Sequence, residues 1–165
     1  MPGSTDPTLL DALLDSWDRN NRILLGLLRL LPPDTLDLRP IPSSPSVGEL
    51  FCHIHYVRLI FVLEDAPEFA KPMPEGEWRT ERNVDRLSAM LNESAKAVRD
   101  AVRGRLASGR PMDQHYDHPL LMFQHFIWHA GYHHGQIKLT LKLAGRPVSN
   151  HDAGPATWRV WMLKH

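Results

Sequence analysis

Apolar residues recur at intervals of three or four positions in four segments of the chain, which is the spacing of an amphipathic helix. Three of these segments cover residues 7–31, 46–64 and 83–106, and the fourth runs from Pro119 to a glycine-proline stop at residues 144–147. The alternation of apolar and polar residues that marks a β-strand is nearly absent. The pattern therefore predicts an all-α fold with four long helices.

Four amphipathic helices bury their apolar faces by packing against one another, so the sequence predicts a four-helix bundle. The connection between the second and third helices is long, and its prolines, Pro67, Pro72 and Pro74, prevent it from continuing as a helix. A connection of this length leaves room for an up-down-down-up order of the helices. We expect the bundle to have that order.

The remaining segments add no second domain to this picture. Residues 110–118 are polar and are expected to form a loop or a short hairpin, with Asp117 or His118 capping the fourth helix. Gly154 and Pro155 interrupt the tail, which argues against a fifth long helix. Because no internal repeat or change in composition divides the chain, we expect one domain over residues 1–165.

Composition narrows the classes of function. The chain has 165 residues, of which 42% are hydrophobic and 23% are charged, and its formal net charge is zero. It contains no block of lysine or arginine, so nucleic-acid binding is disfavoured. The single cysteine, Cys52, excludes an intramolecular disulfide, and we interpret it as a buried, inert thiol. Neither a signal peptide nor a membrane-spanning segment is evident, so we expect a cytoplasmic protein without a membrane partner.

The most informative polar pair is His129 and His133 on the fourth predicted helix. Side chains at i and i+4 project from the same helix face about 5–6 Å apart, and neutral imidazole is a common metal ligand. The same stripe carries three more polar residues, His125, Gln136 and Thr140, whereas His134 points elsewhere. A pair at this spacing also arises by chance or as a hydrogen-bonded surface pair. A third ligand is needed to indicate a metal site.

His53 is the candidate third ligand. It lies two turns into the second predicted helix, which opens with a capping box formed by Ser46 and Glu49. His53 lies on an apolar face of that helix. His55 is rotated by about 200° around the helix axis from His53, so we expect it to face outward. A single inward histidine is often a core residue hydrogen-bonded to a neighbour. Together with the pair on the fourth helix, however, His53 predicts a three-histidine metal site.

Residues 129–136 read H-A-G-Y-H-H-G-Q and residues 143–147 read L-A-G-R-P, while Cys52-His53-Ile54 stands in the second predicted helix and W-R-V-W near the end. In these motifs the chain resembles, over nearly its whole length, the DinB-like (YfiT-like) four-helix-bundle metalloproteins, whose fourth helix reads H-x-x-H-H-R-G-Q before L-x-G-x-P. The resemblance implies that His53, His129 and His133 are the metal ligands. Tyr132 stands where a histidine is common and His134 where an arginine is common. Neither is a ligand position, but both departures affect what the pocket accepts.

Three neutral imidazoles leave at least one coordination position for water or substrate, which is typical of catalytic sites. A bound divalent ion would lower the pKa of water or orient a thiolate. Imidazole suits zinc, nickel, iron and copper; we expect zinc or nickel, with iron or manganese as alternatives. The resembled family includes transferases and isomerases that use low-molecular-weight thiols. We therefore expect a metal-dependent enzyme, a thiol-dependent transferase or a hydrolase, that acts on a small molecule and forms a homodimer.

Two other classes stay open at this point. The chain could be a non-enzymatic metal-binding bundle of the stress-response type, which a sealed core or a fourth protein ligand would favour. It could also be a bundle whose aromatic residues line a cavity for a small ligand. Four polar residues near the predicted ligands have no assigned catalytic role: Glu49, Glu64, His125 and Gln136.

Overall fold

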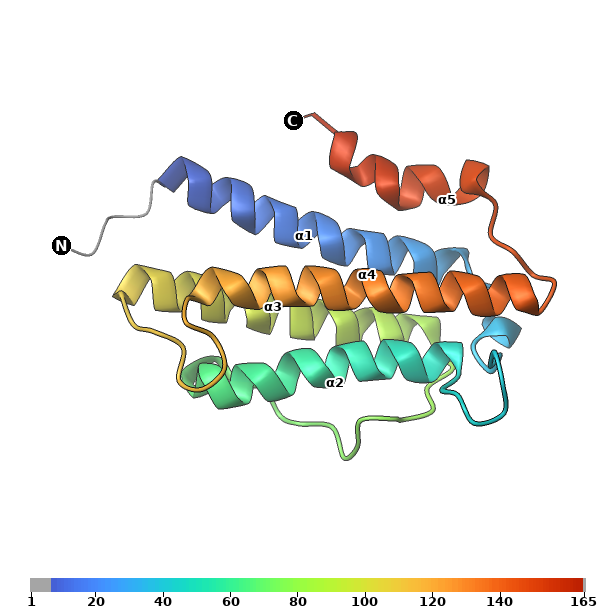
Figure 1. Cartoon of the computed structure of the whole chain (residues 1–165), viewed down its shortest axis with the longest axis horizontal. Helices are drawn as coiled ribbons and strands as arrows, with labels where there is room; N and C mark the ends of the chain where they lie inside the picture. The colour runs from blue at the N-terminus through green and yellow to red at the C-terminus, as the bar shows by residue number, and fades with distance from the viewer. Residues whose placement is uncertain (1–6, 165) are drawn as a thin grey trace.

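Four long helices and one short helix make up the protein in the computed structural model, which describes residues 7–164 (Figure 1). The long helices are α1 (Pro7–Leu30), α2 (Val47–Asp65), α3 (Val84–Ser108) and α4 (Pro119–Leu143), and the short one is α5 (Asn150–Ala156). Three short 3₁₀ turns are η1 (Pro33–Thr35), η2 (Pro67–Phe69) and η3 (Trp158–Met162). No strand occurs between residues 7 and 164, so the all-α prediction is confirmed.

The helix ends follow from capping residues in the sequence. The hydroxyl of Ser46 accepts a hydrogen bond from the Glu49 amide at 3.2 Å, and the Glu49 carboxylate accepts one from the Ser46 amide at 2.7 Å. The predicted capping box is therefore present at the start of α2. His118 caps α4. Gly109 and Gly145, with φ of 65° and 70°, adopt the left-handed conformation that ends α3 and follows α4.

The direction of each helix can be followed in Figure 1. The view shows α1 and α4 running from left to right, and α2 and α3 running from right to left. The connection over residues 66–83 returns along the outside of the bundle from the end of α2 to the start of α3. We call this connection the strap; its Trp78 stacks on the ring of His53 in α2.

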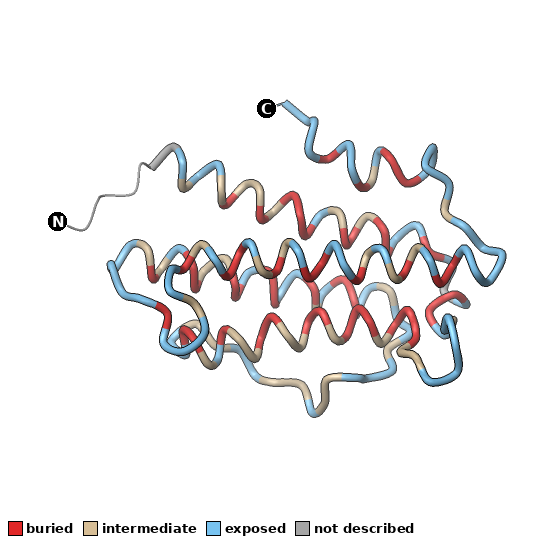
Figure 2. The backbone as a smooth tube through the Cα atoms, viewed as in Figure 1, coloured by how far each residue is buried: buried red, intermediate tan, exposed pale blue. Residues whose placement is uncertain are grey.

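The core fills the space between the long helices (Figure 2). Buried apolar side chains form two clusters along the bundle. In one of them Trp17 is completely buried, its indole N–H donates to the Ala95 carbonyl at 2.8 Å, and its ring stacks on Phe123 at 5.3 Å between centroids. Burying an indole requires such a partner for its N–H, which fixes how α1 lies against α3.

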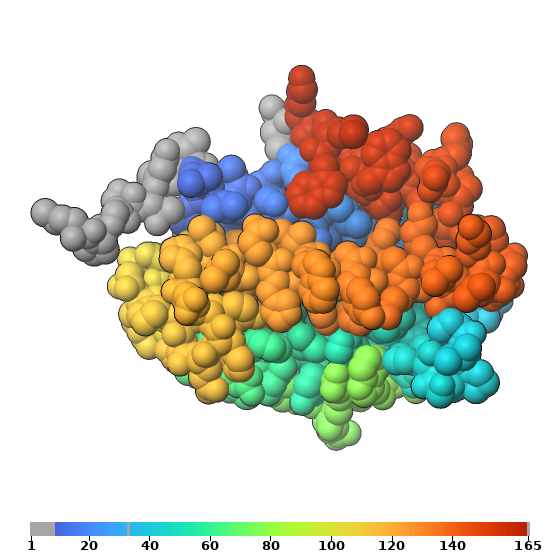
Figure 3. All heavy atoms as spheres, viewed as in Figure 1, coloured from blue at the N-terminus to red at the C-terminus, as the bar shows by residue number. Residues whose placement is uncertain are grey.

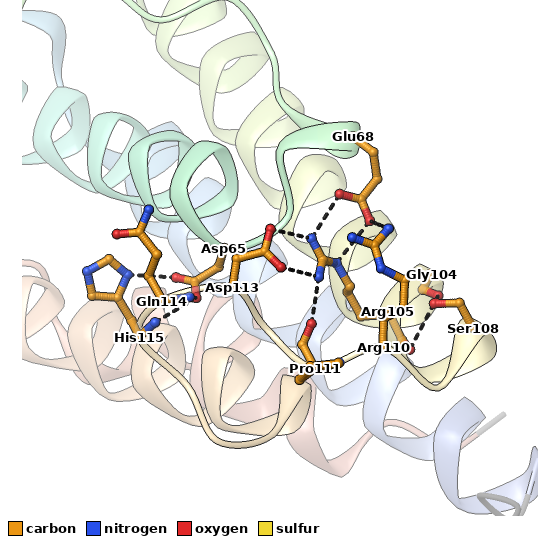
Figure 4. A network of polar contacts seen from close by, with 10 residues as sticks. All are labelled: Asp65, Glu68, Gly104, Arg105, Ser108, Arg110, Pro111, Asp113, Gln114 and His115. Carbon is orange, nitrogen blue, oxygen red and sulfur yellow. Dashed lines mark hydrogen bonds and ion pairs between the residues drawn. The ribbon is translucent and has the colours of Figure 1, made fainter.

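A polar network holds the loop over residues 110–118 at one end of the bundle (Figure 4). The buried carboxylate of Asp65 accepts hydrogen bonds from the amides of Gln114 and His115 at 3.0 and 2.7 Å. The buried guanidinium of Arg105 donates to Asp113 at 2.6 Å and pairs with Glu68 at 2.9 Å. The segment is therefore a loop rather than a hairpin.

The prediction that His55 faces outward is wrong. Its side chain is only 4% exposed, because α3 covers the face of α2 that lies opposite His53, while α4 covers the other. Burial lowers the pKa of His55. A helix held between two others has two inward faces, so a single amphipathic stripe does not describe it.

The C-terminal segment packs against α1 (Figure 1). Gly26 permits this contact, because a Cβ atom at that position would lie 2.0 Å from the Ala156 carbonyl oxygen. Trp158, Trp161 and Met162 remain exposed on the segment. His151 lies at the surface as expected, and His165 lies outside the described residues. None of the helices between residues 7 and 164 is long and apolar enough to span a membrane.

Candidate metal centre

Three histidines from α2 and α4 converge on one point. The Nε2 atom of His129 lies 3.1 Å from Nε2 of His53 and 3.0 Å from Nε2 of His133. Ligand atoms of all three lie within 4.8 Å of one another. His129 and His133 are buried and His53 is partly buried. The structure thus brings together the three residues that the sequence singled out.

The outer nitrogens of two of these rings are already occupied. The Glu77 carboxylate lies 2.7 Å from Nδ1 of His53, and the Gln136 side-chain oxygen lies 2.8 Å from Nδ1 of His133. Both oxygens are acceptors, so each Nδ1 carries the proton and donates. The Nε2 atoms of His53 and His133 are then lone-pair acceptors that face the centre of the cluster.

Hydrogen bonding alone does not satisfy this arrangement. His129 Nε2 can supply at most one proton, yet two acceptor nitrogens lie about 3 Å away from it. At least one of the two acceptor nitrogens is therefore left without a proton to accept. A cation at the centre would satisfy all three nitrogens at once. Metal–nitrogen bonds of about 2.0–2.1 Å in a tetrahedral site place ligand nitrogens roughly 3.3 Å apart, close to the spacing found here.

The electrostatics of the cluster keep its three imidazole rings uncharged. Burial, with a smaller contribution from the neighbouring His133 and His53, lowers the pKa of His129 to about 3. The pKa values of His53 and His133 are also lowered by burial, which the hydrogen bonds to Glu77 and Gln136 partly oppose. At neutral pH the rings are therefore neutral, the form that binds a metal.

The centre is open on one side. A pocket of about 540 Å³ has the three histidines in its wall and is bounded by α4, the loop around Pro40 and Pro45, and the strap at Trp78. Figure 3 shows these segments side by side on the viewed face, with α4 in orange, the loop in cyan and the strap in light green. Among residues 7–164 no cysteine, carboxylate or further histidine lies close enough to be a fourth ligand. A bound ion would therefore keep a position for a small molecule.

A comparison with protein families identifies the fold. The family model described as the DinB family matches residues 1–159. The chain belongs to the DinB family. Neither the comparison with curated proteins nor the one with solved structures found a match. Family membership agrees with the resemblance in the sequence and with the three-histidine cluster.

Other residues that the sequence singled out have different places in this DinB-family protein. His125 lies on the ligand stripe, but its Nδ1 is 2.7 Å from the Tyr116 hydroxyl, outside the cluster. His134 lies on another side of α4, beside the C-terminal segment. Tyr132 stands at the rim of the pocket. Glu49 belongs to the capping box, and Glu64 lies 3.7 Å from His115.

Cys52 follows the expectation of an inert thiol. It is buried, and burial raises the pKa of its thiol to about 11. It therefore stays protonated at neutral pH.

Sequence reasoning did not find two residues of the site, Glu77 and Trp78. Both lie on the strap between α2 and α3, where no helical period indicates a direction. The Trp78 indole lies flat on the His53 ring, with 4.3 Å between centroids and 2° between planes. An acidic residue beside a tryptophan in a proline-rich linker was the available signal, but spacing alone could not place it beside His53.

Proposed function

We propose that this protein is a metal-dependent enzyme whose ligands are His53, His129 and His133, carried by an up-down-down-up bundle. Zinc and nickel are the proposed ions, because three imidazoles without a carboxylate suit borderline metals better than manganese. One observation carries the proposal: three Nε2 atoms converge while the Nδ1 atoms of two rings are bound elsewhere.

The residues around the ligands have separable roles in this proposal. Glu77 and Gln136 fix the orientation and tautomer of His53 and His133, as hydrogen-bonding partners of metal ligands generally do. A divalent ion held there would supply Lewis acidity, which makes water or a thiol a better nucleophile at neutral pH. The proposed reaction is transfer involving a low-molecular-weight thiol, or hydrolysis.

The open pocket favours catalysis over a purely structural role for the ion. Structural sites usually close the coordination sphere with four protein ligands, whereas catalytic sites use three and leave access for substrate. Here three ligands adjoin a pocket of about 540 Å³, within the size range of small-molecule sites.

Metal analysis tests the proposal. Protein purified without a histidine tag should contain about one divalent ion per chain, as expected for a single three-histidine site. His53→Ala and His129→Ala should each lose it. His151→Ala is the matched control, because this exposed histidine belongs to α5 and does not line the pocket beside the cluster. Wild-type protein that neither contains metal nor binds zinc or nickel on titration would overturn the proposal.

The same preparation then serves for assays of activity. Loaded and chelator-treated protein should be compared for thiol transfer to electrophiles and for hydrolysis of esters and amides. Activity that disappears with the metal and returns on reloading would support an enzyme. A protein that binds metal yet turns over neither class of substrate would contradict the proposed reactions.

We also propose that the chain forms a homodimer. Trp158, Trp161 and Met162 leave apolar surface exposed on the C-terminal segment, and association of two chains would cover such surface. Light scattering should report the mass of two chains. The mass of one chain at micromolar concentration would refute this.

A further inference from the structure

Three aromatic side chains stand exposed around the histidine cluster. Trp78, Trp128 and Tyr132 are 47%, 65% and 53% exposed, and all three line the pocket. Trp78 comes from the strap, whereas Trp128 and Tyr132 come from successive turns of α4. Single exposed apolar side chains are common on protein surfaces, but a group of them beside a candidate metal site indicates a ligand-binding surface. A ligand could cover the apolar area that these side chains expose to water.

The aromatic rings are arranged around the histidines. Trp78 stacks on His53 at 4.3 Å, and Tyr132 meets His133 edge-on at 5.0 Å. Trp128 and Tyr132 stack on each other at 5.8 Å with 15° between their planes. The mouth of the pocket therefore presents aromatic faces and edges next to the point where the Nε2 atoms converge. Such surfaces bind flat, apolar groups by offset or edge-to-face contact.

Apart from the three histidines, the lining of this pocket contains no acidic or basic side chain. No lysine, arginine, aspartate or glutamate lines it, and two of its polar groups already have partners. The Gln136 oxygen is bound to His133, and the Thr140 hydroxyl donates to the Gln136 carbonyl at 2.9 Å. A charged group on the body of a ligand would lose water here without gaining a partner of opposite charge.

This neutral lining is not a general property of the protein's surface. A second pocket of similar size, about 520 Å³, lies between the ends of α1 and α4 and the C-terminal segment. Arg146 and Asp152 both line that pocket. The absence of charge is therefore specific to the pocket beside the histidines.

We propose that the site selects a small molecule with a flat, uncharged, apolar body and a single donor atom that reaches the metal. This inference rests on the proposed function, since the donor atom requires a metal at His53, His129 and His133. The aromatic rim holds the body of the molecule, and the open coordination position receives its donor. Trp78, Trp128 and Tyr132 are then specificity-determining residues, whereas the ion held by the three histidines would accept any compact donor.

Thiols with and without such a body test the inference. The probes are phenylmethanethiol, which has a flat apolar body, 2-mercaptoethanol, which has almost none, and 3-mercaptopropanesulfonate, which carries a charge. The full chain is loaded with cobalt(II) in place of the native ion, and each thiol is titrated against the visible absorption of the cobalt. This readout reports coordination without requiring turnover.

Phenylmethanethiol should bind at least about tenfold more tightly than 2-mercaptoethanol, as expected when a phenyl-sized group is buried. The sulfonate should bind no better than 2-mercaptoethanol. Trp128→Ala and Tyr132→Ala should each weaken phenylmethanethiol binding about threefold to tenfold, the range typical of one aromatic contact. Both should leave 2-mercaptoethanol binding unchanged. Their exposure makes a folding defect a minor concern.

Leu121→Ala is the control, because Leu121 is a similarly exposed apolar residue of α4 that does not line this pocket. It should change neither affinity. Cobalt spectra that respond equally to all three thiols, or an aromatic preference that survives both rim substitutions, would overturn the inference while leaving the metal site standing. Protein that binds no cobalt would overturn the proposed function and this inference together.

Discussion

Replacing Glu77 tests whether the strap contributes to metal binding. The Glu77 carboxylate lies 2.7 Å from Nδ1 of His53 and belongs to the segment between η2 and α3. Glu77→Ala removes the acceptor, so the His53 ring can rotate and change its tautomer. Glu77→Gln retains an oxygen acceptor but removes the negative charge. The pair of variants therefore separates orientation of the ring from its electrostatic support.

The expected magnitude follows from the contact. Loss of a hydrogen-bonding partner of a ligating histidine typically costs about 10- to 100-fold in metal affinity, or roughly 1.4–2.7 kcal/mol. Glu77 is 38% exposed at its side chain, so solvent screens part of its charge. We therefore expect Glu77→Ala to lower metal affinity by about tenfold, near the lower end of that range. The affinity of Glu77→Gln should lie between that of Glu77→Ala and that of the wild type.

Competition with a chromophoric chelator measures zinc affinity in each variant at constant pH and salt. Glu75→Ala is the control, since Glu75 is an exposed acid on the same strap, two residues away. It should bind zinc as the wild type does. The reasoning is refuted if Glu77→Ala keeps wild-type affinity, or if Glu75→Ala loses as much, because the effect would then be general surface charge.

Three further predictions concern stability. Gly26→Ala should lower the free energy of unfolding by about 1–3 kcal/mol, because its new methyl group would overlap the Ala156 carbonyl. Gly131 has open space around it, so Gly131→Ala should raise the free energy of unfolding by about 0.5–1 kcal/mol. Denaturant titrations measure both changes. Arg58 is completely buried, and although its Nη1 donates to the Asn21 side-chain oxygen at 3.0 Å, its Nε and Nη2 atoms have no partner among the described residues. Arg58→Met should therefore be neutral or stabilising by about 1–4 kcal/mol; a loss of similar size would show that the Asn21 hydrogen bond and the contact with the Trp17 ring outweigh the cost of burying the charge. Metal-free protein should lose stability as the pH falls from about 7 to about 4. The reason is that His129 binds a proton near the ordinary histidine pKa in the unfolded chain, whereas its pKa in the folded protein is about 3. In thermal denaturation, His129→Ala should make stability depend less on pH.

Helical periodicity predicted most of the fold because each long helix has one dominant apolar stripe or a clear capping signal. The capping box at Ser46 and the glycine after α4 set boundaries that the structure reproduces within a residue or two. His55 shows where that reasoning fails. Position along a helix gives the angle between His53 and His55, but it does not tell how many neighbours the helix has. With α3 and α4 on two sides, both histidines of α2 turn toward protein.

The residues of the site also differ in whether helical periodicity determines their direction. His129 and His133 could be paired from sequence because a helix fixes the direction of side chains four residues apart. His53 could be added because its own helix fixes an inward direction. Glu77 and Trp78 lie on a segment without a repeating backbone geometry, so their directions depend on tertiary contacts alone. The positions of the three clustered histidines are thus set by local periodicity, whereas the residues that orient His53 and shape the pocket depend on where the strap crosses the bundle. Substitutions on the strap should therefore change affinity and selectivity while the four helices remain folded.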